Sequence, residues 1–162
     1  PHYSSRRQRQ MCIRDRKIHG TCVAIGNEAI LFRGPSGSGK SDLALRVIHC
    51  GGKLVSDDQT IIVRQEEELI MSSPENIRDK IEVRGVGIMN MPSKEGARLG
   101  LVLDMMPPEK IDRIPIPQFC WYLGLQVPVL GLEPFENSAP LKVQLAINSM
   151  RSSNKYAPTN TQ

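Results

Sequence analysis

The sequence predicts a single-domain α/β fold, because three features of the chain agree. Its 162 residues suffice for one ordinary domain, and 40% hydrophobic with 23% charged residues is typical of soluble mixed folds. An apolar run at 29–32 leads into a glycine-rich segment at 34–39, and a helical pattern follows at 42–49. A strand, a glycine loop and a helix in this order indicate a βα unit joined by a tight turn.

The elements around this unit follow from apolar periodicity and turn residues. Residues 21–25 and 29–33 flank the turn sequence Gly-Asn-Glu and predict a hairpin. The helix over 42–49 repeats apolar residues at helical spacing and ends before the glycine pair 51–52. Further short strands are expected at 53–56, 60–64, 69–71 and 80–84.

The strand at 80–84 alternates between charged and apolar residues, so it has one buried and one exposed face. Glu82 and Arg84 share the charged face, and their spacing alone favours a solvated surface. A site acid and a phosphate-binding guanidinium are the functional alternative for this pair.

The second half of the chain predicts two strands, a loop and a helix. A buried strand is expected at 100–104 and another at 126–130, where Pro128 favours an edge position. Residues 107–118 contain four prolines and no regular pattern, so they are a candidate mobile active-site loop. The last helix is expected over 140–148.

Positive charge is concentrated at the start of the chain. The whole sequence carries +4, but residues 1–17 carry +5 and the remaining residues −1. This balance argues against a basic nucleic-acid-binding domain. We expect residues 1–17 to be a disordered or non-native basic arm, residues 18–150 to form the folded catalytic domain, and residues 151–162 to be a disordered tail.

The cysteines and the apolar runs indicate a cytoplasmic protein. The four cysteines form neither a C-x-x-C pair nor a cluster at zinc-ligand spacing, which favours small buried side chains in a reducing compartment. Residues 1–16 have no apolar segment typical of a secretory signal. No apolar run approaches the length of a membrane span, so no membrane contact is expected.

Residues 34–41 match the phosphate-binding pattern G-x-x-x-x-G-K-[ST]. Its glycines let the backbone approach a ligand, and successive N–H groups converge at the start of the following helix. Lys40 can reach the β- and γ-phosphates, and the Ser41 hydroxyl can bind Mg²⁺. A glycine-rich turn without a ligand would explain neither side chain. The expected binding residues are Gly34, Pro35, Ser36, Gly37, Ser38, Gly39, Lys40, Ser41 and Asp42.

Two adjacent acids follow the short strand at 53–56. Phosphoryl transfer needs a carboxylate near Mg²⁺ and a second one that accepts the proton of the attacking hydroxyl. Asp57 and Asp58 could divide these tasks. The alternative is a simple turn, because Asp favours turns by bonding its own backbone. Next to a phosphate loop, the functional interpretation is favoured.

Four stretches of the sequence resemble the HPr kinase/phosphorylase family, specifically its catalytic C-terminal domain. They are residues 18–20, 34–42, 55–58 and 81–88. The last reads Ile-Glu-Val-Arg-Gly-Val-Gly-Ile, close to the family signature I-E-[VI]-R-G-x-G-I. The resemblance extends from residue 18 to about 150. It implies a P-loop-containing, HPr kinase-like fold with a mixed central β-sheet flanked by helices.

The resemblance also implies an activity. Members are ATP-dependent, Mg²⁺-requiring serine kinases that phosphorylate the phosphocarrier HPr, and they catalyse the reverse phosphorolysis by inorganic phosphate, which gives pyrophosphate. They are homohexamers. The short chain resembles the alphaproteobacterial form, for which the partner would be HPr or an HPr-like protein.

Roles for single residues follow from the same resemblance. Lys40 and the loop amides would hold the β-phosphate, while Ser41 with Asp58 and Glu82 would serve the metal.

The proton-transfer side of the site is implied in the same way. Asp57 would be the general base towards the serine hydroxyl and the general acid in the reverse direction. His19 would orient or tune that carboxylate, and Arg113 in the proline-rich loop would contact phosphate.

Two other functions stay open. A small-metabolite P-loop kinase usually has a helical, arginine-rich lid, whereas residues 105–118 are rich in proline. An ATP-sensing regulatory module would bind ATP without making a phosphoprotein. A GTPase would need an [NT]-K-x-D motif, which residues 93–96 do not match.

Overall fold

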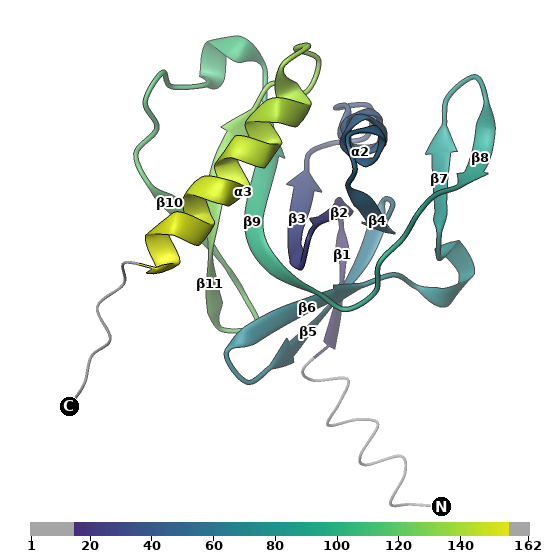
Figure 1. Cartoon of the computed structure of the whole chain (residues 1–162), viewed down its shortest axis with the longest axis horizontal. Helices are drawn as coiled ribbons and strands as arrows, with labels where there is room; N and C mark the ends of the chain where they lie inside the picture. The colour runs from purple at the N-terminus through teal and green to yellow at the C-terminus, as the bar shows by residue number, and fades with distance from the viewer. Residues whose placement is uncertain (1–14, 156–162) are drawn as a thin grey trace, which may run out of the picture.

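A curled mixed sheet forms the centre of the protein, and a two-stranded hairpin projects beside it (Figure 1). The computed structural model describes residues 15–155. In these residues, the nine strands of the central sheet are β1 (Asp15–His19), β2 (Thr21–Ile25), β3 (Glu28–Arg33), β4 (Lys53–Ser56), β5 (Gln59–Gln65), β6 (Glu68–Ser72), β9 (Ala97–Met105), β10 (Gln118–Tyr122) and β11 (Leu125–Leu132). The hairpin consists of β7 (Lys80–Val83) and β8 (Gly87–Asn90).

Two α-helices are described, α2 (Lys40–His49) and α3 (Ala139–Lys155), with short 3-10 turns at Glu75–Ile77 and Pro108–Lys110. No helix in the described part of the chain is both long and apolar enough to cross a membrane.

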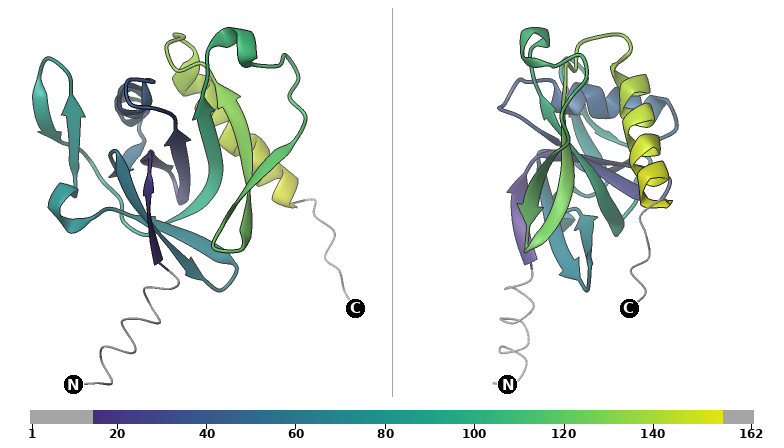
Figure 2. Two further views of the ribbon diagram at one scale, coloured as in Figure 1. Left: turned by 180° about the vertical axis from the view of Figure 1, so that it is seen from behind. Right: turned by 90° about the vertical axis from the view of Figure 1, so that its left-hand side faces the viewer.

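The sheet is mixed, which confirms the predicted fold class. Strand β3 runs parallel to β9, and β9 runs parallel to β11, while the other pairs are antiparallel. Strand β9 pairs with β3 along one side. On its other side it pairs with β6 at residues 97–98 and with β11 at residues 102–105. The sheet therefore divides at β9, which lets β1, β5 and β6 turn away from β10 and β11 (Figure 2).

Both helices lie on one face of the sheet. The four central residues of β3 are buried. Ile30 and Phe32 pack in the core under α2 and α3, while Ala29 and Leu31 belong to the core on the opposite face. The opposite face is closed by the curled strands β1, β5 and β6 instead of by a helix. This two-sided burial explains the unbroken apolar run in the sequence.

The predicted elements between residues 21 and 105 are confirmed, and the structure adds three strands. Strand β1 pairs only with β5, and its single buried residue is Ile18, so the sequence gives little sign of it. Strands β8 and β10 were also not expected. The expected domain boundaries at residues 17 and 150 fall inside β1 and α3, because β1 begins at Asp15 and α3 ends at Lys155. The rest of the expected arm and tail, 1–14 and 156–162, lies outside the described residues.

The expectation that Pro128 marks an edge strand is wrong, because β11 lies between β9 and β10. The turn after Tyr122 has two residues, so Tyr122↔Leu125 is the closing hydrogen-bonded pair. Hydrogen-bonded and non-hydrogen-bonded pairs alternate from there, which makes Phe119↔Pro128 a non-hydrogen-bonded pair. The missing proline N–H therefore points away from β10. On that other side, pairing with β9 begins one residue later, at Val129.

Candidate functional site

The phosphate-binding loop connects the end of β3 with the start of α2. Gly39 adopts φ +97°, and a Cβ there would lie 3.0 Å from side-chain atoms of Pro134 and Phe135. A Cβ on Gly34 would lie 2.6 Å from the Ser38 hydroxyl oxygen, which is buried under the loop. Because both positions exclude a side chain, the loop keeps the tight course that the motif predicts.

Lys40 is buried at the first turn of α2. Its Nζ donates hydrogen bonds to the carbonyl oxygens of Gly34 at 2.7 Å and Pro35 at 2.9 Å. The ammonium group is therefore held inside the loop, against the backbone that the motif assigns to phosphate binding.

Asp57 is buried and accepts three hydrogen bonds. The Ser41 hydroxyl donates to Oδ1 at 2.6 Å, and the Thr21 hydroxyl donates to the same oxygen at 3.1 Å. The backbone N–H of Glu82 donates to Oδ2 at 3.2 Å. This carboxylate is thus fixed between the phosphate loop, β2 and β7.

Asp58 has a different environment. Its side chain is 63% exposed, and Oδ1 lies 3.5 Å from Nε2 of His19. Its backbone has φ +65°, and its N–H donates to the Thr21 hydroxyl at 3.2 Å. The contact that the structure shows for His19 is thus with Asp58, while three other groups hold Asp57. The left-handed turn at Asp58 places the Asp58 carboxylate beside the end of β1.

A cleft of about 460 Å³ contains the phosphate loop and both acids. It also contains Glu82 and Arg84, so the charged face of β7 is exposed and belongs to the cleft. Arg113 is exposed in the loop before β10, and neither it nor His19 lines this cleft in the part of the chain that the structure describes. Of the expected site residues, those lining the cleft are Ser36, Gly37, Gly39, Lys40, Ser41, Asp42, Asp57, Asp58 and Glu82.

The oxygen donors near Ser41 fit Mg²⁺ bound together with a nucleotide. No group of three or more His, Cys, Asp or Glu side chains within residues 15–155 forms a complete metal site. Mg²⁺ commonly uses one or two carboxylates, substrate phosphates and water, so a full protein cage is not required. The Ser41 hydroxyl, Asp57, Asp58 and Glu82 are the groups available in the cleft.

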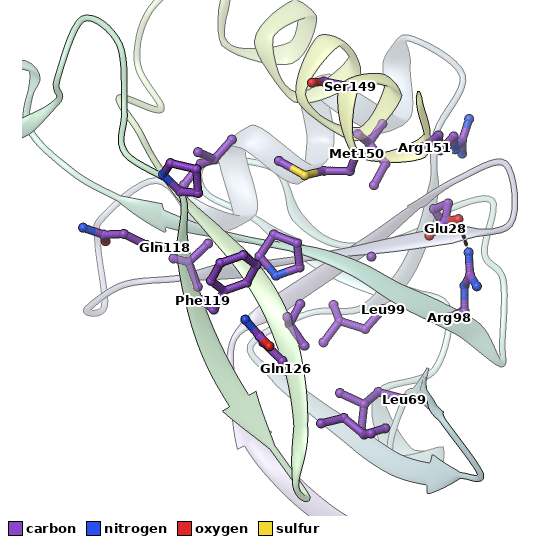
Figure 3. A pocket seen from close by; sticks show the side chains of 18 of the residues that line it. Glu28, Leu69, Arg98, Leu99, Gln118, Phe119, Gln126, Ser149, Met150 and Arg151 are labelled. Carbon is purple, nitrogen blue, oxygen red and sulfur yellow. Dashed lines mark hydrogen bonds and ion pairs between the residues drawn. The ribbon is translucent and has the colours of Figure 1, made fainter. Parts of the chain in front are cut away.

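A larger hollow of about 790 Å³ lies between α3, β6, β9 and β11 (Figure 3). The charged side chains around it are already paired. Arg98 lies 2.6 Å from Glu28, and Arg151 donates to the Ile25 carbonyl oxygen at 2.7 Å. No expected site residue lines this hollow, so size alone does not identify the reactive site.

Sequence reasoning missed Thr21, which contacts both acids. A threonine in a predicted strand carries no signal of this role. Asp104, the acid that follows the apolar run at 101–103 on the strand parallel to β3, does not line the cleft. Here Arg33 holds Asp104 with two hydrogen bonds, of 2.7 and 2.9 Å. These bonds raise the pKa of the Arg33 guanidinium, and they hold the Asp104 carboxylate outside the cleft.

The chain is similar to proteins of one family. The model of the HPr Serine kinase C-terminal domain family matches residues 10–101. The HPr kinase/phosphorylase of Geobacillus thermodenitrificans is 39% identical over 109 residues, which cover 60% of this chain and 35% of that protein. The HPr kinase/phosphorylase of Caldicellulosiruptor bescii is 33% identical over 152 residues, covering 85% of this chain and 49% of that protein.

The fold also matches a solved structure. The Hpr(Ser) kinase/phosphatase from Coxiella burnetii aligns with a TM-score of 0.78 and 24% identity, covering 86% of this chain and 99% of that chain. At this identity the match concerns the fold. The chain spans about half or less of the length of the two relatives named above.

Proposed function

The chain belongs to the HPr serine kinase C-terminal domain family, and we propose that it is an ATP-dependent kinase for a serine of HPr or an HPr-like protein. The observation that carries this proposal is the pair of acids beside the phosphate loop. Asp57 is bonded to Ser41 of the loop, while Asp58 is open to solvent at 3.5 Å from His19. Asp57 is thereby available to bind the metal, and Asp58 is available to accept the proton of the substrate hydroxyl.

We propose that the loop N–H groups and Lys40 bind the phosphates of ATP. Ser41 and Asp57, with Glu82 at the cleft wall, would hold Mg²⁺. When bound, the metal would neutralise charge that develops on the transferred phosphoryl group.

The geometry favours a division of roles opposite to the one that the family resemblance implies. A general base must reach the substrate hydroxyl, and the exposed Asp58 can do so. In the forward reaction, the substrate serine Oγ attacks the γ-phosphorus of ATP, its proton passes to Asp58, and ADP leaves. His19 would position the Asp58 carboxylate.

The reverse reaction would use the same groups. Inorganic phosphate attacks the phosphorus of phosphoserine, the serine Oγ leaves, and Asp58 returns a proton to that oxygen. The products are the free serine and pyrophosphate. Arg84 lines the cleft and would bind phosphate oxygens. A phosphate contact by Arg113, assembly into a homo-oligomer and a cytoplasmic location are proposals that rest on the family resemblance.

The decisive experiment is incubation with purified HPr, ATP and Mg²⁺, followed by intact-mass measurement. The wild type is compared with Asp57→Asn and Asp58→Asn. A phosphate-sized gain on HPr that is lost in both variants supports the kinase, and its reversal by phosphate with pyrophosphate release supports phosphorolysis. ATP binding without any phosphoprotein from the wild type would contradict the kinase and favour an ATP-sensing module.

A further inference from the structure

The β7–β8 hairpin carries two large apolar side chains in solvent. Val86 is 66% exposed and Ile88 is 70% exposed. Scattered exposed apolar residues are normal on protein surfaces. These two, however, are two positions apart on a hairpin whose opposite face is already buried through Ile81. Val86 lies in the turn and Ile88 in β8, and burial in the fold accounts for neither side chain.

Ile88 lies on the hairpin face that borders the phosphate cleft, where it adjoins the charged side chain of Glu82. Ile88 is directly paired with Glu82 across the hairpin, so their side chains leave from the same face. Glu82 lines the cleft together with Arg84. Figure 1 shows the hairpin projecting from the body beside α2, the helix that begins at the phosphate loop.

The hairpin is attached firmly to the reactive groups. The N–H of Glu82 donates to Asp57 at 3.2 Å, and Ile81 packs in the same core as Leu43 and Val47 of α2. A molecule held on the outer face of the hairpin would therefore lie at a fixed distance from the acids and from the phosphate loop.

We propose that Val86 and Ile88 form a docking surface for the protein substrate, which contacts them with apolar side chains next to its target serine. This proposal rests on the proposed kinase function and adds how the substrate is recognised. A small metabolite would fit within the cleft and would leave this surface unused. A folded protein that presents a serine to the cleft must cover the surface beside it. The buried centre of such an interface is more apolar than its rim, and a few residues there carry most of the affinity.

The test uses the full chain with the double substitution Val86→Ser/Ile88→Ser and HPr as the probe. We expect the KM for HPr to rise roughly tenfold, with kcat and the ATP affinity within about twofold of the wild type. Titration of HPr without ATP should show the same loss of affinity. Trp121→Ser is the matched control, because Trp121 is 64% exposed but lies on β10, away from the cleft. This control should leave the KM for HPr unchanged.

Three results would overturn the proposal. The first is an unchanged KM in the double variant, which would leave the kinase function intact. The second is an equal loss in Trp121→Ser. The third is a change in the oligomeric mass of the double variant, which would identify the surface as a contact between copies of this chain. If the wild type does not phosphorylate HPr, the kinase proposal fails, and the HPr titration still decides whether the hairpin binds it.

Discussion

The Ser41 hydroxyl donates a hydrogen bond of 2.6 Å to Asp57, and this bond joins the phosphate loop to the end of β4. Asp57 accepts two further hydrogen bonds, from Thr21 and from the backbone of Glu82. The neighbouring acid, Asp58, accepts none of these and remains open to solvent. Adjacent residues in the sequence thus have separate environments and are suited to separate tasks.

The first prediction concerns this division. Asp57→Asn should weaken Mg²⁺-dependent ATP binding by about tenfold or more, because one negative charge beside Ser41 is lost. Asp58→Asn should bind MgATP within about threefold of the wild type, while phosphoryl transfer falls by roughly 10²–10⁴. ATP titration with and without Mg²⁺, together with single-turnover transfer to HPr, measures both effects. The opposite pattern would assign the roles as the family resemblance implies.

The second prediction concerns Thr21, which is buried and bonded to both acids. Thr21→Val keeps the shape of the side chain but leaves Asp57 Oδ1 and the Asp58 N–H each without one partner. We expect a loss of about 1–3 kcal/mol in the free energy of unfolding and a lower kcat. Thr21→Ser should restore most of both. Urea unfolding measures the free energy of unfolding, and steady-state kinetics measure kcat. A fully active Thr21→Val would show that the hydrogen bonds of Thr21 are not needed for activity.

The fold around the phosphate loop could be predicted because local patterns agree there with tertiary structure. The four central residues of β3 are apolar since they are buried on both faces of the sheet, and α2 has one apolar face. Strand β1 lacks such a pattern, because its residues are held by backbone pairing to β5 and only Ile18 enters the core. Pro128 misled the prediction because its effect depends on which side of the strand lacks a hydrogen bond.

The site could be predicted as a set of residues but not as a set of contacts. The phosphate-loop stretch and the adjacent acids identify eight residues of the cleft, and Glu82 is a ninth. The contact of His19 with Asp58 depends on the left-handed backbone of Asp58, which no sequence pattern specifies. The same holds for Arg33 and Asp104, which meet only because β3 and β9 are parallel neighbours in that register.

The third prediction separates backbone strain from crowding in the phosphate loop. Gly37 and Gly39 both have positive φ, but a Cβ would meet nothing within 4 Å at Gly37 and would meet Pro134 and Phe135 at 3.0 Å at Gly39. Gly37→Ala should therefore cost about 1 kcal/mol of stability from the backbone alone. Gly39→Ala should cost about 1 kcal/mol more. Thermal unfolding without nucleotide measures the stability of both variants. Equal losses of stability would show that Pro134 and Phe135 move aside without an energetic cost.

The fourth prediction concerns the pair Arg33–Asp104, which lies directly before the loop. Both side chains are about 30% exposed, and they share two hydrogen bonds. Arg33→Gln should cost about 1–2 kcal/mol, because Asp104 keeps its charge without the guanidinium. Arg78→Gln is the control, since the Arg78–Glu95 pair is single and more exposed, and should cost less than about 0.5 kcal/mol. Similar losses in urea unfolding would contradict a special role for Arg33.

The fifth prediction is a pH dependence that originates from Cys22. Burial raises the pKa of its thiol above the ordinary value of 9.0, so the folded protein keeps the thiol neutral. Above about pH 9 the unfolded chain can release this proton while the folded protein cannot. The stabilisation is therefore complete below pH 9 and declines by about 1.4 kcal/mol for each pH unit above it. Other groups also titrate in this range, so the useful quantity is a difference between variants.

Cys22→Ala provides that difference, because it removes the thiol from a fully buried position. The free energy of unfolding in urea, measured at pH 8, 9 and 10, should fall more steeply for the wild type than for Cys22→Ala. Cys50→Ala is the control, since Cys50 is exposed and its substitution should leave the wild-type slope unchanged. Parallel slopes for the wild type and Cys22→Ala would mean that the Cys22 thiol can ionise in the folded protein, through water entry or local opening of the core between β2, β3 and β4.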